Sequence, residues 1–377
     1  MISLDLEHVC LLELIKTSLF GYSSQIPENV NWENVFESAK NQCIVPLVSS
    51  FVPISYRSEW LNFTYASKAH YMHMLYEQDS LIKLFNVNKI PFFIFKGTAA
   101  AVYYPNPALR TFGDVDFYVP EASFDSAKIL MQENNYIYTT NNDRHYSYEK
   151  NGITFELHNR ISRKGDYDID HIVLNDYETF ETRINNICFP TLSVYKNGLI
   201  LLWHIMHHLK VSGIGLRQII DWMMFVHNAL DDLAWNDHFR TLAVEAGLEK
   251  LAITVTYMCK KWLGLPDDIT WCNNADEELA DRLLVLVLDD GNFGRDRAPY
   301  EKVKKSMKKE GVIKYLFSAG IENWPLAQKY PVFKPFALFF QLCRYLIKLI
   351  IGFFTGKKMF MKDKNSMSLE EFWERLE

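Results

Sequence analysis

Two aspartates separated by one residue offer the clearest chemistry in this sequence. They are Asp114 and Asp116, in the segment Gly113-Asp114-Val115-Asp116. Alternate side chains of a strand point to the same face, and the two Cα atoms then lie about 6.5–7 Å apart. Both carboxylates can reach one divalent cation or bracket two, and a cation relieves their mutual repulsion. Because the surrounding residues are apolar, the pattern predicts a metal site on a strand and not a surface run of charge.

A second predicted strand, Ile153–His158, alternates polar and apolar residues. Glu156 and His158 share one face, and the intervening apolar residues face a core. If this strand lies beside the first, Glu156 becomes a third carboxylate next to Asp114 and Asp116. Three such acids can hold two metal ions for phosphoryl transfer, one on a triphosphate and one shared with the third acid at the attacking hydroxyl. Without the aspartates, a solvated edge-strand residue would be the better interpretation of Glu156.

A glycine at a predicted strand-to-helix turn suits phosphate binding. Gly97 lets the backbone approach an anion closely, and the start of the following helix attracts negative charge. Lys96 adds a positive charge, and Thr98 adds a hydroxyl near the helix cap. Arg110 can hold phosphate oxygens or fix its loop by pairing with an acid. The predicted nucleotide-binding residues are Lys96, Gly97, Thr98 and Arg110.

Two further pairs have the i, i+4 spacing that places side chains on one helix face. His204 and His208, with His207 nearby, have a spacing that can bind zinc, but no third ligand accompanies them. Core or substrate-facing histidines are therefore favoured. Arg217 and Asp221 predict a structural ion pair that could also line a substrate pocket. The candidate substrate-positioning residues are His158, His208, Arg217 and Asp221.

These motifs, in this order, resemble the uncharacterised nucleotidyltransferase family of the DNA-polymerase-beta-like superfamily. The resemblance lies in the Lys96-Gly97 turn, in Arg110 before a Gly-Asp-hydrophobic-Asp strand, and in Glu156-Leu157-His158. It extends to AKNQCIVPL, which ends at Leu47, and to the predicted helices containing WHIMHHLK and LRQIIDW. It covers about residues 30–230.

The resemblance implies Asp114 and Asp116 as metal ligands and Glu156 as the third acid and candidate general base. It implies Mg²⁺ or Mn²⁺ as cofactor and a nucleoside triphosphate as donor. Many members of the wider superfamily carry Gly-Ser at the phosphate turn, where Thr98 could replace the hydroxyl here. His158 would position substrate, support Glu156, or act as a structural histidine.

The elements that position these residues follow from the apolar patterning. Residues up to about 88 predict helices, the third running from about 58 to 86. Strands are expected at 90–95 and 114–119, each followed by a helix. Three more short strands follow, and an Asn151-Gly152 turn joins the last two. Expected elements are strands at 136–138, 146–148 and 153–158, and helices at 193–210, 215–230, 235–246, 248–263, 275–288, 301–317 and 335–354.

The predicted fold class is α+β, with a small mixed β-sheet nucleotidyltransferase core flanked by helical lobes. The core is expected at 88–190, the N-terminal lobe at 1–87 and the larger C-terminal lobe at 191–377. Aromatic residues make up 15%, which excludes a disordered chain. The balance of 40 basic and 46 acidic residues gives −6 and disfavours generic nucleic-acid binding.

Location is predicted from cysteines and apolar segments. The six cysteines form no CxxC pair, which favours a reduced, cytoplasmic compartment. The apolar segment 335–354 is interrupted by Arg344 and Lys348, so a mostly buried helix is favoured over a bilayer span. The alternative is an interfacial helix whose following lysines meet anionic lipid, giving peripheral membrane contact.

The sequence therefore predicts a Mg²⁺-dependent nucleotidyltransferase that moves a nucleoside monophosphate from an NTP to an acceptor and releases pyrophosphate. The acceptor is left open between a small molecule, sugar, peptide, protein or tRNA, and the acidic balance makes a large nucleic acid less favoured. One alternative is a non-catalytic nucleotide-binding or scaffold module of the same fold. The other is a metal-dependent glycosyltransferase, ranked last because the first 88 residues predict helices and not alternating strands and helices.

Overall fold

The computed structural model describes residues 4–163, 167–211, 213–292, 317, 331–340, 342 and 369–376. The chain forms two compact units, Met1–Arg295 with Ser368–Glu377, and Asp296–Met367. In the second unit, a 3₁₀ helix covers Pro331–Phe336. All elements discussed below belong to the first unit. The division of the chain into three lobes stays a prediction.

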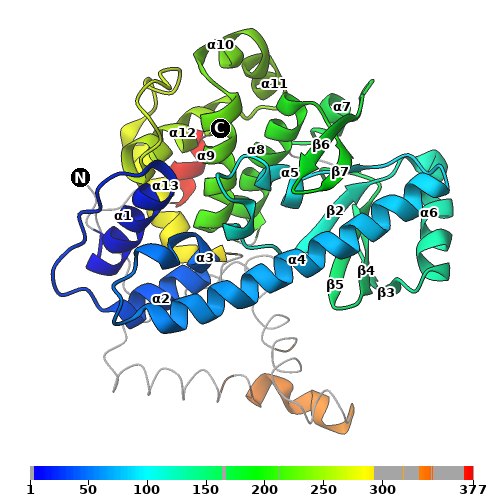
Figure 1. Cartoon of the computed structure of the whole chain (residues 1–377), viewed down its shortest axis with the longest axis horizontal. Coiled ribbons are helices and arrows are strands. Elements are labelled where there is room, and N and C mark those ends of the chain that lie inside the picture. Colours follow the sequence, from blue (N-terminus) through cyan, green and yellow to red (C-terminus); the bar gives the residue numbers. More distant parts are fainter. Residues whose placement is uncertain are drawn as a thin grey trace. The chain divides into compact units, whose positions relative to one another are not determined.

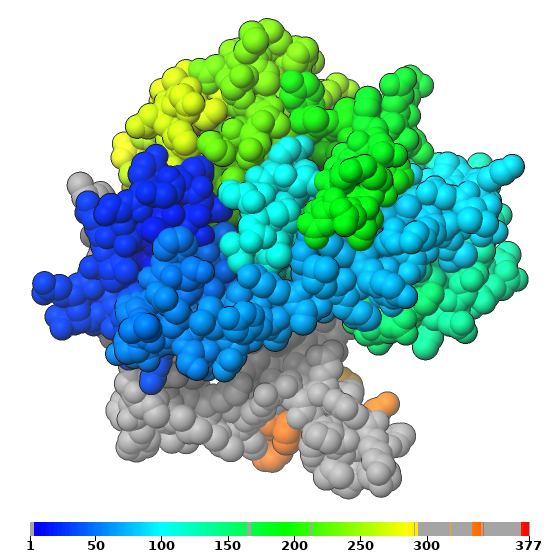
Figure 2. All heavy atoms as spheres, viewed as in Figure 1, coloured from blue at the N-terminus to red at the C-terminus, as the bar shows by residue number. Residues whose placement is uncertain are grey.

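Helices make up the N-terminal part of the first unit, as predicted. They are α1 (Leu6–Phe20), α2 (Trp32–Asn41), α3 (Val45–Val48) and α4 (Arg57–Val87). The side chains of Asp5 and Asn31 cap α1 and α2 by accepting hydrogen bonds from backbone amides. With 31 residues, α4 runs from the other N-terminal helices to the sheet (Figure 1). Its residues form a band across one face of the molecule (Figure 2).

A five-stranded mixed sheet lies beside α4, with strand order β1-β2-β5-β4-β3. The central strands β2 and β5 pair in parallel, and the other neighbours pair antiparallel. Asn151 and Gly152, both with positive φ, form the tight turn that joins β4 to β5, as predicted. The strands are β1 (Phe93–Ile94), β2 (Asp114–Tyr118), β3 (Ile137–Asn141), β4 (His145–Lys150) and β5 (Ile153–His158).

The alternation in β2 and β5 separates a core face from a polar face. Phe117, Phe155 and Leu157 have no solvent exposure. The ring of Phe85 from α4 packs edge-on against Phe117, with centroids 5.5 Å apart. Short helices α5 (Gly97–Ala101) and α6 (Glu121–Glu133) follow β1 and β2.

A second, two-stranded sheet was absent from the sequence prediction. It consists of β6 (Phe180–Ile184) and β7 (Ile187–Thr191), paired antiparallel. The hydroxyl of Thr191 donates to the carbonyl of Ile94 at 2.7 Å, which ties β7 to β1. Pro190 lies within β7, and a proline inside a short apolar run argues against a strand, so the pattern hid this hairpin.

The C-terminal helices pack closely through α8 (Val194–Val211) and α9 (Leu216–Ala229). A Cβ at Gly198 would lie 2.2 Å from Cζ of Phe225, so only glycine permits this approach. The other helices with at least six residues here are α11 (Arg240–Glu245), α12 (Glu249–Leu263), α13 (Glu277–Asp290) and α18 (Leu369–Leu376).

The predicted α+β class, with a small mixed sheet flanked by helices, is confirmed. The predicted helix 301–317, apart from residue 317, lies outside the described residues. So does most of the predicted helix 335–354. No helix in the described ranges combines the length and apolar character that a bilayer crossing requires.

Candidate active site

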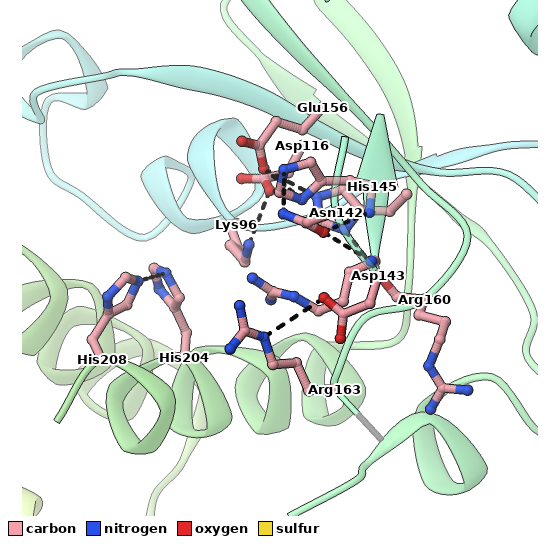
Figure 3. Close-up of polar contacts among 12 residues, drawn as sticks. Lys96, Asp116, Asn142, Asp143, His145, Glu156, Arg160, Arg163, His204 and His208 are labelled. Atoms are coloured by element: carbon pink, nitrogen blue, oxygen red, sulfur yellow. Dashed lines mark hydrogen bonds and ion pairs between the residues drawn. The ribbon is translucent and has the colours of Figure 1, made fainter. Parts of the chain in front are cut away.

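Three carboxylates converge where β2 and β5 lie side by side. The parallel register places Asp116 opposite Glu156, and Asp114 lies two residues earlier on the same face. One oxygen from each of the three lies within 4.8 Å of the others. Figure 3 shows Asp116 and Glu156 next to each other, with Lys96 directed toward them. The convergence expected from the sequence is therefore present, while the catalytic roles of these acids stay predictions.

The two aspartates differ in pKa because their charged neighbours differ. Burial raises the pKa of Asp114 to about 6, and the charges of Asp116 and Glu156 add to this effect. Burial alone would also raise the pKa of Asp116, but the Lys96 ammonium and the His158 imidazole outweigh it and hold that pKa well below its usual range. Lys96 Nζ lies 2.9 Å from Asp116 Oδ1. Asp114 is thus the carboxylate whose charge is least compensated.

The turn that follows β1 carries unusual backbone. Lys96 has φ 54° and ψ −139°, a region that residues other than glycine rarely adopt and that costs about 1–3 kcal/mol. The next residue, Gly97, also has positive φ. Thr98 is buried, and its hydroxyl donates to Gln78 Oε1 of α4 at 2.9 Å. Lys96 and Gly97 line the cavity beside the acids, whereas the contact of Thr98 holds α5 against α4.

His158 lies between the acids and the backbone. Its Nδ1 is 3.0 Å from the carbonyl oxygen of Arg160, and its Nε2 is 3.0 Å from Asp116 Oδ1 and 3.3 Å from Glu156 Oε2. Since both ring nitrogens face acceptors, both donate and the ring is cationic. Burial lowers the pKa of His158, but the hydrogen bonds to the two acids outweigh burial and raise it.

His145, the first residue of β4, was not predicted from the sequence. Its Nδ1 lies 3.3 Å from Glu156 Oε2, and Asn142 Nδ2 donates to its Nε2 at 3.0 Å. Burial and the neighbouring charge of His158 lower the pKa of His145 to about 4, so it is neutral. His145, Glu156 and His158 form a second group whose atoms could hold a metal. The signal that could have found His145 is its position opposite His158 in the β4–β5 hairpin.

A closed ionic network lies beside the acids. Arg110 donates from Nε and Nη2 to the two oxygens of Asp221, at 2.8 and 2.7 Å. The hydroxyl of Tyr104 donates to Asp221 Oδ1 at 2.8 Å. Arg110 Nη1 and Arg217 Nη1 each donate to the carbonyl of Thr111 at 3.3 Å. Of the two roles expected for Arg110, this geometry supports fixing the loop before β2 by pairing with an acid.

The histidines of α8 face the acids across the cavity (Figure 3). Nε2 of His204 lies 2.6 Å from Nε2 of His208, and the ring of His207 stacks on Trp203. Burial lowers the pKa of all three histidines, that of His207 to about 4. Within the described residues, the groups of three that could hold a metal both lie on the sheet. These findings favour neutral, cavity-facing histidines over zinc ligands.

The cavity itself has a volume of about 240 Å³. It contains Arg144, which sequence reasoning missed because that residue precedes β4 in a loop without a recognisable motif. Thr98 and His158, both predicted for the site, are not among the lining residues. The lining residues are Lys96, Gly97, Arg110, Gly113, Asp114, Asp116, Arg144, His145, Glu156, Leu201, His204, His207, His208, Arg217 and Asp221.

Comparison with known proteins assigns a family to this geometry. Residues 28–264 match the model of the uncharacterised nucleotidyltransferase family. The chain belongs to this nucleotidyltransferase family. No curated protein matches it. A solved structure similar to it is an antigenic nucleotidyltransferase-like protein from Paracoccidioides brasiliensis, at 14% identity and a TM-score of 0.32, covering 51% of this chain and 92% of that one.

Proposed function

We propose that this protein is a Mg²⁺-dependent nucleotidyltransferase that moves a nucleoside monophosphate from an NTP to an acceptor hydroxyl and releases pyrophosphate. The observation that carries the proposal is the convergence of Asp114, Asp116 and Glu156, with ligand oxygens within 4.8 Å of one another. Membership of the nucleotidyltransferase family supports the same class of reaction.

The donor set fits a hard divalent cation. Asp114, Asp116 and Glu156 offer carboxylate oxygens, which Mg²⁺ and Mn²⁺ prefer. Burial raises the pKa of Asp114, and the charges of Asp116 and Glu156 add to this effect, so a bound cation would stabilise its charged form. These three residues would hold the metal. When bound, it would neutralise triphosphate charge and make the attacking hydroxyl more acidic.

Some of the protein's own groups would contact the donor NTP, and others would contact the acceptor hydroxyl. Lys96 Nζ, now on Asp116, would turn to the triphosphate once a cation balances that carboxylate, and Gly97 leaves the backbone open beside it. The acceptor oxygen would bond to the α-phosphorus while the bond to the pyrophosphate oxygen breaks. Glu156 would take the hydroxyl proton, and His158, whose Nε2 lies 3.3 Å from its Oε2, would fix its orientation.

The size of the cavity bears on how much substrate it encloses. Cavities that enclose drug-sized ligands usually measure about 300–1,000 Å³, whereas this one measures about 240 Å³. The proposal therefore places the reacting phosphates and the hydroxyl-bearing end of the acceptor inside, and the nucleobase and the remainder of the acceptor outside. The acceptor stays open between a small molecule, sugar, peptide or protein.

The test measures pyrophosphate release by the full chain with Mg²⁺, each common NTP and a panel of hydroxyl-bearing acceptors. We expect Asp116→Asn to lower the rate at least about 100-fold, because a ligand that stabilises the transition state is lost. Asp125→Asn is the matched control, since Asp125 is an exposed acid of α6 that pairs with Lys128 and is not among the residues that line the cavity. Equal rates for wild type and Asp116→Asn would refute the proposal.

A non-catalytic nucleotide-binding module is the second candidate. The observation that favours it is the double engagement of Asp116 Oδ1, by Lys96 at 2.9 Å and by His158 at 3.0 Å. Such a carboxylate could be structural. Calorimetric binding of Mg²⁺-ATP without pyrophosphate release for any acceptor would support this candidate.

A further inference from the structure

Arg144, immediately before β4, is a buried cation at the cavity. It is 8% exposed, and its Nε is buried without a hydrogen-bond partner. Among the described residues, no carboxylate forms an ion pair with it. Its guanidinium lies over the ring of Trp203, 5.4 Å from the ring centre. This ring attracts the cation but supplies no hydrogen-bond acceptor to it.

An arginine this buried normally has an anionic partner, because desolvated charge is costly. Arg110, equally buried, has one in Asp221. Burial lowers the pKa of Arg144, and the charge of Arg163 acts in the same direction. Asp116, Glu156 and Asp143 attract Arg144, but none of them lies within ion-pair distance of it. A cation on Asp116 and Glu156 would weaken this attraction, and an anionic ligand would then balance the charge of Arg144.

The order of the strands indicates whether the ligand of Arg144 is the donor or the acceptor. Lys96 and Gly97 follow the edge strand β1, and the acids lie on β2 and β5. Arg144 precedes β4, the next strand beyond β5. In strand order, β5 with Glu156 therefore lies between β4, which Arg144 precedes, and the turn after β1 that is assigned to the donor phosphates. Under the proposed function, on which this step rests, the Glu156 side is where the attacking hydroxyl binds.

We propose that Arg144 binds an oxyanion of the acceptor, so that the acceptor is a hydroxyl compound carrying a phosphate or a carboxylate. A guanidinium donates two parallel hydrogen bonds to either group, which would orient the hydroxyl toward Glu156. His207, which stacks on the same Trp203 ring, lines the neighbouring wall of the cavity.

The test is calorimetry on the full chain saturated with Mg²⁺ and a non-hydrolysable ATP analogue, which occupies the donor site. Inorganic phosphate and acetate are titrated separately, so that the two arms tell phosphate from carboxylate. We expect at least one to bind the wild type and its affinity to fall about tenfold or more in Arg144→Gln. Arg144→Lys, which keeps the charge without the fork, should recover only part of the loss.

The matched control is Arg240→Gln, because Arg240 is 57% exposed, pairs with Glu249 at 2.7 Å and is not among the residues that line the cavity. It should bind the anions like the wild type. Unchanged anion affinity in a folded Arg144→Gln, judged by its thermal unfolding, would overturn the inference. Loss of binding of the ATP analogue in Arg144→Gln would also overturn it, since Arg144 would then belong to the donor side.

A further titration of phosphate without nucleotide or metal distinguishes failure of the anion site from failure of the proposed function. If wild type binds no nucleotide but binds phosphate through Arg144, the proposed function fails while the anion site stands. If nucleotide binds and neither anion does, the anion site fails while the proposed function stands.

Discussion

Two buried ionic clusters lie side by side in this protein and differ in how their charges are matched. In one, Arg110 donates two hydrogen bonds to the carboxylate of Asp221, and the hydroxyl of Tyr104 donates a third. In the other, three carboxylates face one ammonium and one imidazolium. The first cluster is saturated by the protein's own groups. The second contains Asp114, whose pKa is raised to about 6 by burial and by the charges of Asp116 and Glu156.

The difference separates a structural role from a ligand-binding role. Breaking a saturated pair leaves one charge stranded and destabilises the fold. Removing one of the three crowded carboxylates should instead relieve repulsion and, under the proposed function, abolish activity, the pattern expected where stability has been given up for activity. Charge matching, more than burial alone, therefore distinguishes the two clusters. The following changes test this distinction.

The largest expected effect on stability belongs to the saturated cluster. Asp221→Ala should lower the free energy of unfolding by about 3–5 kcal/mol, because Arg110 becomes an uncompensated buried charge. Urea denaturation measures it. The double variant Arg110→Met/Asp221→Leu should lose much less. A loss below about 1 kcal/mol in Asp221→Ala would show that Arg110 is not held structurally and would reopen its assignment to phosphate.

Removing a carboxylate from the second cluster should have the opposite effect and raise the free energy of unfolding. The pKa of Asp114 is about 6 in the folded chain and 3.8 in its reference state. The folded state therefore keeps a proton that the unfolded state loses, and this contribution disappears as pH rises from 4 to above 6. Asp114→Asn should match wild type near pH 4 and exceed its stability by up to about 3 kcal/mol at pH 7.

Denaturation of both chains across pH 4–7 measures that difference. The lowered pKa values of His145 and His207 make both chains more stable as pH rises, and this shared effect cancels in the comparison. Added Mg²⁺ should stabilise wild type but not the variant. A difference in stability between the two chains that does not change with pH would contradict the raised pKa of Asp114.

Replacing Lys96 separates strain from ligand binding. Lys96→Met and Lys96→Gly should each weaken Mg²⁺-ATP binding about 10- to 100-fold, by calorimetry, because the cation facing the triphosphate is lost. The glycine variant should be more stable than the methionine variant by about 1–3 kcal/mol, since glycine tolerates φ 54°. Equal stability of the two variants would mean that the backbone at residue 96 stores no strain.

The smallest effect is expected outside both clusters. Arg163→Gln removes a half-exposed ion pair with Asp143, whose atoms are 3.7 Å apart. Such pairs contribute little, so the free energy of unfolding should change by less than about 0.5 kcal/mol. A larger change in denaturation would show that position, as well as charge matching, controls the cost of losing a charge in this region.

The sequence predicted those parts of the candidate site whose structure is determined by local periodicity and a few special residues. The alternation in Asp114–Tyr118 and Ile153–His158 identified both central strands, and Asn151-Gly152 identified their hairpin neighbour. Convergence of the acids needed one assumption, that the two strands are adjacent. The register satisfies it by placing Asp116 opposite Glu156.

What the sequence did not predict depends on contacts between distant segments. The partner of Arg110 is Asp221, 111 residues away, and the partner of Thr98 is Gln78 on a different helix. Neither pairing has a local signature. Arg144 and His145 were missed for the same reason, because only the β4–β5 pairing brings them to Glu156.

The parallel pairing of β2 with β5 also has a consequence for how the chain acquires its chemistry. The Asp116–His158 contact spans 42 residues, so it closes a long loop, whereas the β4–β5 hairpin closes locally. We expect the hairpin to form early and the β2–β5 contact late during folding. The reactive centre would then exist only in completely folded molecules, so an unfinished nascent chain would be inert toward nucleotides.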